Sequence, residues 1–153
     1  MMLNNELQLS FPDGFRVMDE AELAGLKMIA EGPGCCVKDD SRHMVISVSW
    51  KKPGAFAGLL LSVNDLAASM EKYIRKGNAP FGYRLDEFRD ITIGGHSARG
   101  IRYRYSVQGI EMLGESYVLK SGKQLYYFHL YTRSSLPDNL KIWESILNSA
   151  QWS

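Results

Sequence analysis

Hydrophobic and polar residues alternate along three successive segments in the C-terminal half of the chain, the pattern of half-buried β-strands. These segments are Ser97–Ser106, Ile110–Lys120 and Lys123–Arg133. They are separated by Gln108-Gly109 and Ser121-Gly122, and a glycine at the second position of a two-residue turn supplies the positive φ that tight hairpins require. The pattern therefore predicts an antiparallel meander of three strands.

These two turns also predict the register, because opposite positions across a hairpin add to a constant. The first turn places Arg102 opposite Glu115, and the second places Tyr117 opposite Tyr126. One predicted face collects Ile101, Tyr103, Tyr105, Met112, Val118, Leu125, Tyr127 and Tyr131. The other carries Arg102, Arg104, Glu111 and Glu115 at one end and Tyr117, Tyr126, Phe128 and Leu130 at the other. Both faces are apolar over Leu125–Tyr131, so we expect both to be covered.

Two amphipathic helices are available to cover them. Asn64–Lys76 carries a predicted buried stripe of Leu66, Met70, Tyr73 and Ile74, with Asn64 or Ser62 as its cap. A second helix begins at Pro137 or Asp138, runs to about Ala150, and buries Leu140, Trp143, Ile146 and Leu147. Asp19–Ala30 is a weaker helix candidate, with Glu22 three residues after a capping Asp19.

Shorter extended segments precede the meander. They are Glu6–Phe11, Phe15–Met18, Cys35–Lys38, His43–Lys51 and Tyr83–Ile93, the last ending at a Gly94-Gly95 turn. Pro53–Gly58 is predicted to be a loop with an exposed Phe56. No linker or repeat divides the chain, so we expect residues 1–153 to form a single domain.

Composition and net charge exclude some classes of binding partner. The chain is 45% hydrophobic with a formal net charge of +1, which gives no electrostatic reason to bind nucleic acid or an anionic membrane. No stretch approaches the roughly 20 apolar residues of a membrane helix. Residues 1–11 lack the basic start and apolar centre of a signal peptide, so we expect a cytoplasmic protein, with a trimmed signal peptide or lipid anchor left open.

The sequence contains no catalytic, metal or cofactor signature. Cys35 and Cys36 are adjacent, so they point to opposite faces of a strand and are poorly placed to pair. His43, His96 and His129 lack the spacing that would place two imidazoles on one metal ion. No Gly-x-Ser-x-Gly turn is present, so we expect a protein that is not an enzyme and holds no cofactor or metal.

Arg99, Arg102 and Arg104 could be mistaken for a nucleic-acid platform with Tyr103 and Tyr105. Strand alternation separates Arg102 and Arg104 from the tyrosines, and Glu111 and Glu115 lie across from or diagonal to the arginines. Such pairs at a surface contribute roughly 0–1 kcal/mol, and they cancel the positive patch that phosphates need.

An excess of aromatic residues is the remaining feature. Tyr117, Tyr126, Phe128 and Tyr131 form more apolar surface than a sheet usually leaves exposed. Helices that cover this surface are the favoured explanation, and a groove for a peptide, a partner helix or a small ligand is the alternative.

The order of elements resembles the PsbP-like superfamily. The resemblance is carried by the turn Leu9-Ser10-Phe11-Pro12-Asp13-Gly14-Phe15, the Val45–Trp50 strand, and a meander closed by a helix with Trp143. It implies an α/β/α sandwich (α+β class) with a central antiparallel sheet. It also implies a mostly non-enzymatic group, with a photosystem II extrinsic subunit, a Ran-binding import factor and bacterial proteins, some of them secretion chaperones. No functional residue carries over.

Two functional hypotheses follow. The first is a bacterial protein-binding module or chaperone-like adaptor, whose partner is another protein or a second copy of the chain. Its candidate contact residues are Tyr117, Tyr126, Phe128, Arg102 and Arg104. The second is a small-ligand carrier with a pocket beneath a helix, involving Tyr103, Tyr127 and His129.

Overall fold

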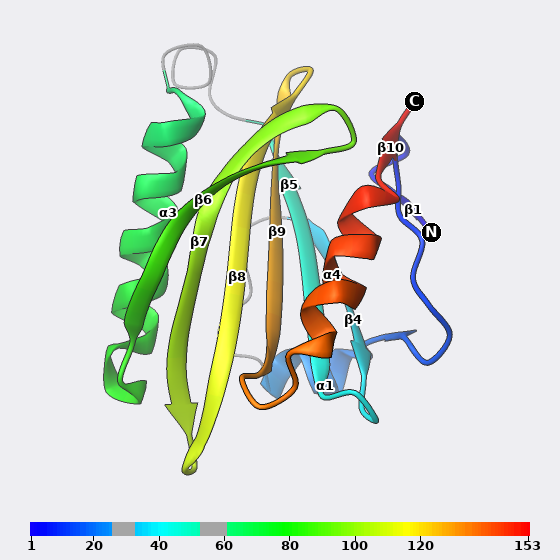
Figure 1. Cartoon of the computed structure of the whole chain (residues 1–153). Coiled ribbons are helices and arrows are strands. Elements are labelled where there is room, and N and C mark those ends of the chain that lie inside the picture. The colour runs from blue at the N-terminus through cyan, green and yellow to red at the C-terminus, as the bar shows by residue number, and fades with distance from the viewer. Residues whose placement is uncertain (26–32, 53–60) are drawn as a thin grey trace.

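The computed structural model describes residues 1–25, 33–52 and 61–153 and is built around an antiparallel sheet of seven strands (Figure 1). From one edge to the other the strands are β3 (Arg16–Val17), β4 (Gly34–Asp39), β5 (Met44–Lys51), β9 (Gln124–Arg133), β8 (Ile110–Ser121), β7 (His96–Val107) and β6 (Arg84–Ile93). Every pair of neighbours is antiparallel. The meander β7–β8–β9 and the central antiparallel sheet are therefore confirmed.

Helices cover both faces of the sheet, as the two-sided apolar pattern predicts. The helix α3 (Val63–Asn78) packs on β7 and β8, followed by a short 3-10 turn, η1 (Ala79–Phe81). The helix α4 (Asp138–Asn148) lies on the opposite face, over the half of the sheet that contains β4, β5 and β9 (Figure 1). The two helices are offset toward opposite ends of the sheet. The result is an α/β/α sandwich with two separate hydrophobic layers.

The N-terminus of α3 is fixed by a capping box. The Ser62 hydroxyl accepts a hydrogen bond from the Asp65 backbone N–H over 3.1 Å, and the Asp65 carboxylate accepts one from the Ser62 N–H. The buried stripe also includes Ala67, Glu71 and Asn78, so it is turned further around the helix than predicted. The prediction that Tyr73 is buried is therefore wrong: it is 60% exposed.

The two meander turns differ in how well they were predicted. Val107 pairs with Ile110 around Gln108-Gly109, both with positive φ, so the first register is confirmed. At the second turn Ser121 pairs with Gln124, and positive φ occurs at Gly122, the first central residue.

The second register is consequently shifted by two residues from the prediction. Tyr117 lies opposite Phe128 and not Tyr126. Since side chains alternate with a period of two, each one stays on its predicted face.

A second, three-stranded sheet joins segments far apart in the sequence. It consists of β1 (Met2–Leu3), β2 (Leu7–Gln8) and β10 (Gln151–Trp152), with β2 in the middle. Leu7 and Leu9 from this region are completely buried in the same layer as α4. Strands of two residues are too short for a periodic pattern, so β1 and β10 were not predicted.

The remaining predictions concern the N-terminal half. The capping box of Asp19 and Glu22 begins α1 (Glu20–Gly25), which confirms the start of the weaker helix. The rest of that predicted helix and the predicted loop at 53–58 lie outside the described residues. Cys35 and Cys36 are free thiols, the first partly exposed and the second buried. No helix within the described ranges is long and apolar enough to cross a membrane.

Candidate functional site

The predicted aromatic contact surface is part of the hydrophobic core. Tyr117, Tyr126 and Phe128 are 1%, 0% and 0% exposed. They pack beneath α4 and the three-stranded sheet, with Trp143 and Leu7 in the same layer. The prediction that these three residues contact a partner is therefore wrong for the folded chain, because its own elements cover them.

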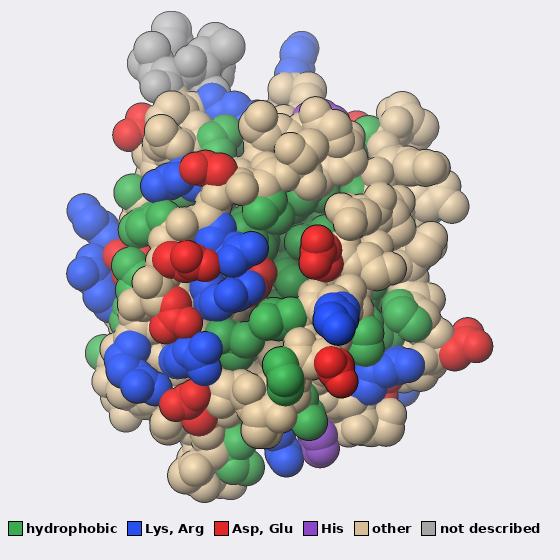
Figure 2. Space-filling view, in the orientation of Figure 1, with side chains coloured by type: hydrophobic (Ala, Val, Ile, Leu, Met, Phe, Trp, Pro, Cys, Tyr) green, Lys and Arg blue, Asp and Glu red, His purple; other side chains and the backbone are tan. Residues whose placement is uncertain are grey.

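Arg102 and Arg104 lie on the part of the same face that α4 leaves open. There, charged side chains of β6, β7 and β8 form a charged network, which consists of Arg84, Asp86, Glu87, Arg89, Arg102, Arg104, Glu111 and Glu115. Figure 2 shows positive and negative side chains interleaved over these strands. The network holds as many arginines as carboxylates, so it presents alternating charge and no single-sign patch.

The outer half of the network is exposed and connects three strands. The Arg104 guanidinium contacts Asp86 on β6 and Glu111 on β8, each over 3.0 Å. Glu111 also accepts a hydrogen bond from Arg84 over 2.9 Å. A hydrogen bond from Ser134, together with those from Arg84 and Arg104, lowers the pKa of the Glu111 carboxyl.

The inner half ends at a buried carboxylate. Glu115 is only 3% exposed, and its Oε2 accepts from Arg102 Nε and Nη2 over 2.8 and 2.6 Å. Its Oε1 accepts from the Tyr117 hydroxyl over 2.7 Å and from Trp143 Nε1 over 3.2 Å. Burial and the adjacent Glu115 raise the pKa of Tyr117. The small stabilisation expected for a surface ion pair does not apply to Arg102 and Glu115, because the Glu115 carboxylate is desolvated and fully hydrogen-bonded.

The residues of the small-ligand hypothesis lie on the other face, in the layer under α3. The rings of Tyr127 and Tyr131 stack on either side of His129, with centroid distances of 6.4 and 6.3 Å. His129 Nδ1 and Ser116 Oγ share a hydrogen bond of 2.7 Å. Burial lowers the pKa of His129 to about 4. Ser116 is completely buried, so this Ser–His pair is packed away from any substrate.

Tyr103 fills the layer beside this pair. It is 0% exposed, and its ring lies so close to Gly114 that a Cβ there would stand 2.2 Å from Tyr103 Cζ. The side chains proposed to line a pocket are therefore packed against the backbone. They form a core layer in which Ser116 and His129 bond to each other, whereas within the described residues no hydrogen-bond partner reaches the buried Tyr103 hydroxyl.

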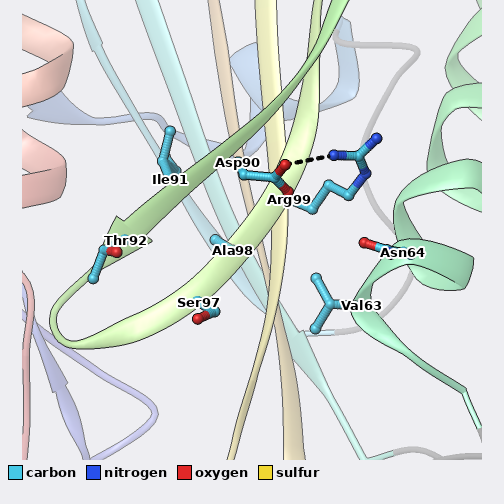
Figure 3. A pocket seen from close by; sticks show the side chains of 8 residues that line it. All are labelled: Val63, Asn64, Asp90, Ile91, Thr92, Ser97, Ala98 and Arg99. Atoms are coloured by element: carbon cyan, nitrogen blue, oxygen red, sulfur yellow. Dashed lines mark hydrogen bonds and ion pairs between the residues drawn. The ribbon is translucent and has the colours of Figure 1, made fainter.

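A cavity of about 370 Å³ lies elsewhere, between the first turn of α3 and the β6–β7 hairpin (Figure 3). Its lining consists of Val63, Asn64, Asp90, Ile91, Thr92, Ser97, Ala98 and Arg99. Arg99 Nη1 donates to Asp90 Oδ2 over 2.8 Å, and its guanidinium stands 5.0 Å from the centre of the Phe88 ring. The arginine is thereby held across one side of the cavity.

The long edge of the main sheet is strand β6. It is the last strand in the order, and no described strand pairs with its outer side. Leu85 and Phe88 on this strand are 40% and 37% exposed. A bulge interrupts its pairing with β7 between Leu85 and Glu87. The segment after the bulge is regular, so it offers unpaired backbone groups in a fixed strand geometry.

Neither a protein-family model nor a curated protein sequence matches the chain. Solved structures match its fold over nearly the whole length. Cyanobacterial PsbP from Synechocystis sp. PCC 6803 superimposes with a TM-score of 0.63, covering 97% of this chain and 93% of its own, at 17% identity. The chain has the PsbP-like fold.

Two other bacterial structures agree. PA94 from Pseudomonas aeruginosa, a protein of unknown function, gives a TM-score of 0.57 with 94% of each chain covered and 18% identity. LpqN from Mycobacterium tuberculosis, involved in cell envelope biogenesis, gives 0.58 with 96% and 83% covered and 13% identity. At these identities the likeness concerns the fold alone.

Within the PsbP-like fold, sequence reasoning missed the cavity and the buried carboxylate. Asp90 was not predicted as a site residue, and Arg99 was assigned to a basic patch that neighbouring glutamates cancel. Strand alternation placed Arg99 on the face of Ile101, which is the face that α3 covers, and this was the available signal. Among the residues that the structure describes, no group of His, Cys, Asp and Glu side chains is arranged to hold a metal ion.

Proposed function

We propose that this protein is a non-catalytic protein-binding module that takes an extended segment of a partner protein along the outer edge of β6. The single observation that carries the proposal is the combination of a long edge strand with exposed Leu85 and Phe88. An added strand gains main-chain hydrogen bonds from the edge, and side-chain contacts give it selectivity.

The charged network supplies that selectivity. Glu87 and Arg89 lie next to Phe88 on the edge strand and alternate with it in facing direction. A partner strand would place an apolar side chain opposite Phe88 and charges complementary to Glu87 and Arg89 on the other face. The bulge and these charges also act against unselective pairing with other exposed strands.

Arg102 and Arg104 keep a role in this proposal that differs from direct contact. Arg104 holds Asp86, and Arg102 lies 4.0 Å from Glu87, so the two arginines orient carboxylates of the edge strand from β7. Arginine suits this task because its planar guanidinium can serve two carboxylates at once. The buried Tyr117, Tyr126 and Phe128 support the sheet from beneath.

The small-ligand hypothesis at Tyr103, Tyr127 and His129 has less support. Tyr103 and His129 are buried and packed against neighbouring residues. The strand edge is exposed without any rearrangement.

The test is site-specific photo-crosslinking in the source cell. A benzoylphenylalanine at Phe88 is compared with one at Tyr73, which is more exposed, at 60% against 37%, but lies on α3. We expect one protein, or a second copy of the chain, to crosslink from position 88 and not from position 73. Substituting Arg89→Glu should then reduce the crosslink. A partner captured from position 73 alone, or no partner from either position, would overturn the proposal.

A further inference from the structure

We propose that the cavity between α3 and the β6–β7 hairpin binds a singly charged carboxylate on a short aliphatic chain, with Arg99 as the residue that contacts the carboxylate. This inference does not depend on strand addition at β6. The cavity volume of about 370 Å³ is at the lower end of the roughly 300–1,000 Å³ typical of small-molecule sites.

Arg99 is held in place with donors to spare. Its side chain is 27% exposed, and Asp90 on one side and the Phe88 ring on the other restrict its rotation. The ion pair with Asp90 uses Nη1 alone. A guanidinium carries five N–H groups in a planar fork. The Nε and Nη2 groups are therefore available to receive a carboxylate in a fixed orientation.

The rest of the lining matches both parts of such a ligand (Figure 3). Polar groups come from the side chains of Asn64, Thr92 and Ser97, which stand on three different elements around the opening. Apolar surface comes from the side chain of Val63, while Ile91 and Ala98 line the cavity with backbone atoms because their side chains point into the layer under α4. A cavity with one cationic group, hydroxyl and amide groups and one aliphatic side chain favours a small acid over a purely apolar molecule.

The charge of Asp90 selects against dianions. Its side chain is 74% exposed at the rim of the cavity, so its field reaches any ligand that approaches Arg99. A monocarboxylate meets the repulsion of Asp90 with a single charge. A phosphate dianion meets the same arginine with an additional repulsion, so the pocket is expected to prefer the carboxylate.

The experiment is a titration followed by amide NMR. Sodium butyrate, n-butanol and inorganic phosphate are added at constant ionic strength, and the amide signals of Asn64, Thr92 and Ser97 are monitored. We expect saturable shifts with butyrate, and smaller, non-saturating shifts with butanol and phosphate. No saturable shift with butyrate, or equal shifts with butanol, would overturn the proposal.

Two cavity variants and one control variant test the role of Arg99. Arg99→Gln should weaken butyrate binding by about tenfold or more, because it removes a charge-assisted hydrogen bond. Arg84→Gln, which removes an arginine from the other face of β6, should leave it unchanged. Asp90→Asn removes the competing carboxylate and should tighten binding a few-fold, which keeps the test decisive should Arg99→Gln fold poorly. Unchanged affinity in both cavity variants would overturn the assignment.

The source of the carboxylate is distinguished by a second ligand. N-acetyl-glutamate N-methylamide presents the same group as an acidic side chain of a protein would. Tighter binding of butyrate assigns the site to a free acid, and tighter binding of the blocked glutamate assigns it to a partner protein. Saturable binding of either supports the carboxylate site, and binding of neither overturns it.

Discussion

The Trp143 indole N–H donates a hydrogen bond to Glu115 Oε1 over 3.2 Å, and this contact joins α4 to the charged network on the sheet. The other oxygen of the same carboxylate faces Arg102. One buried side chain therefore connects a covering helix with the open, charged half of the sheet. The orientation of α4 on the sheet depends on a charge as well as on apolar packing.

The substitution Glu115→Gln should lower the free energy of unfolding by about 3 kcal/mol, because it leaves the Arg102 guanidinium without its buried counter-charge and sets an amide against the donors of Tyr117 and Trp143. Urea unfolding followed by circular dichroism measures the loss. Glu111→Gln is the matched control, since Glu111 is in the exposed half of the network and its loss should be much smaller. Equal losses in the two variants would show that Glu115 acts as a surface residue.

Replacing glycine by alanine at two positions should change the stability of the protein in opposite directions. At Gly100 a Cβ would stand 1.8 Å from the backbone oxygen of Ser116, so Gly100→Ala should cost more than about 3 kcal/mol or prevent folding. At Gly77, inside α3, a Cβ meets nothing within 4 Å, so Gly77→Ala should stabilise the protein by about 0.5–1 kcal/mol. Thermal unfolding of both variants checks the signs, and a stable Gly100→Ala protein would contradict the tight β7–β8 packing.

The stability should fall as the pH drops through the range set by His129. Above about pH 6.5 the ring is neutral in both states. Between pH 6.5 and about 4 the unfolded chain binds a proton that the folded chain excludes, so the unfolded state gains up to about 3 kcal/mol. Below about pH 4 this contribution is constant.

Urea unfolding at pH 7, 6, 5 and 4 measures this dependence. His129→Gln should flatten the slope in that window. A slope that survives in His129→Gln would assign the pH dependence to other groups.

The capping box of α3 should contribute measurably. Ser62→Ala removes the hydroxyl that accepts from the Asp65 N–H and should cost about 1 kcal/mol. Ser62→Asp preserves an acceptor and should lose less. Since Val63 and Asn64 line the cavity, amide NMR of Ser62→Ala also reports whether the cavity depends on this cap. A loss below about 0.3 kcal/mol would indicate that packing alone positions the helix.

The meander shows how far local sequence carries a prediction. Gln108-Gly109 admits positive φ at both positions and fixed its register correctly. At the second turn Gly122 occupies the first central position, and Ser121 belongs to the preceding strand. The predicted and the observed register differ by two residues and put every side chain on the same face, so the alternating pattern could not distinguish between the two registers. The faces were therefore predicted, and the second register was not.

The candidate site was harder to predict because its character depends on contacts between distant segments. The aromatic cluster of Tyr117, Tyr126 and Phe128 was correctly placed on one face. The elements that cover it include β1 and β10, which are two residues long and therefore too short to show a hydrophobic pattern in the sequence. The burial of Glu115 likewise depends on Trp143, 28 residues later. A sequence pattern reports the face of a strand, and tertiary packing decides whether water reaches it.

The three-stranded sheet has a consequence for synthesis. Its middle strand comes from the N-terminal region, while β10 is contributed by residues 151–152, and near it Ser10 N–H bonds to Ser149 Oγ across 139 positions of sequence. Such a closure has to wait until the last of these residues leaves the ribosome. Until then Leu7 and Leu9 lack part of their cover. During translation the nascent chain therefore exposes the apolar side chains of Leu7 and Leu9 until residues 151–152 have been synthesised, and a ribosome-associated chaperone could bind them in that interval.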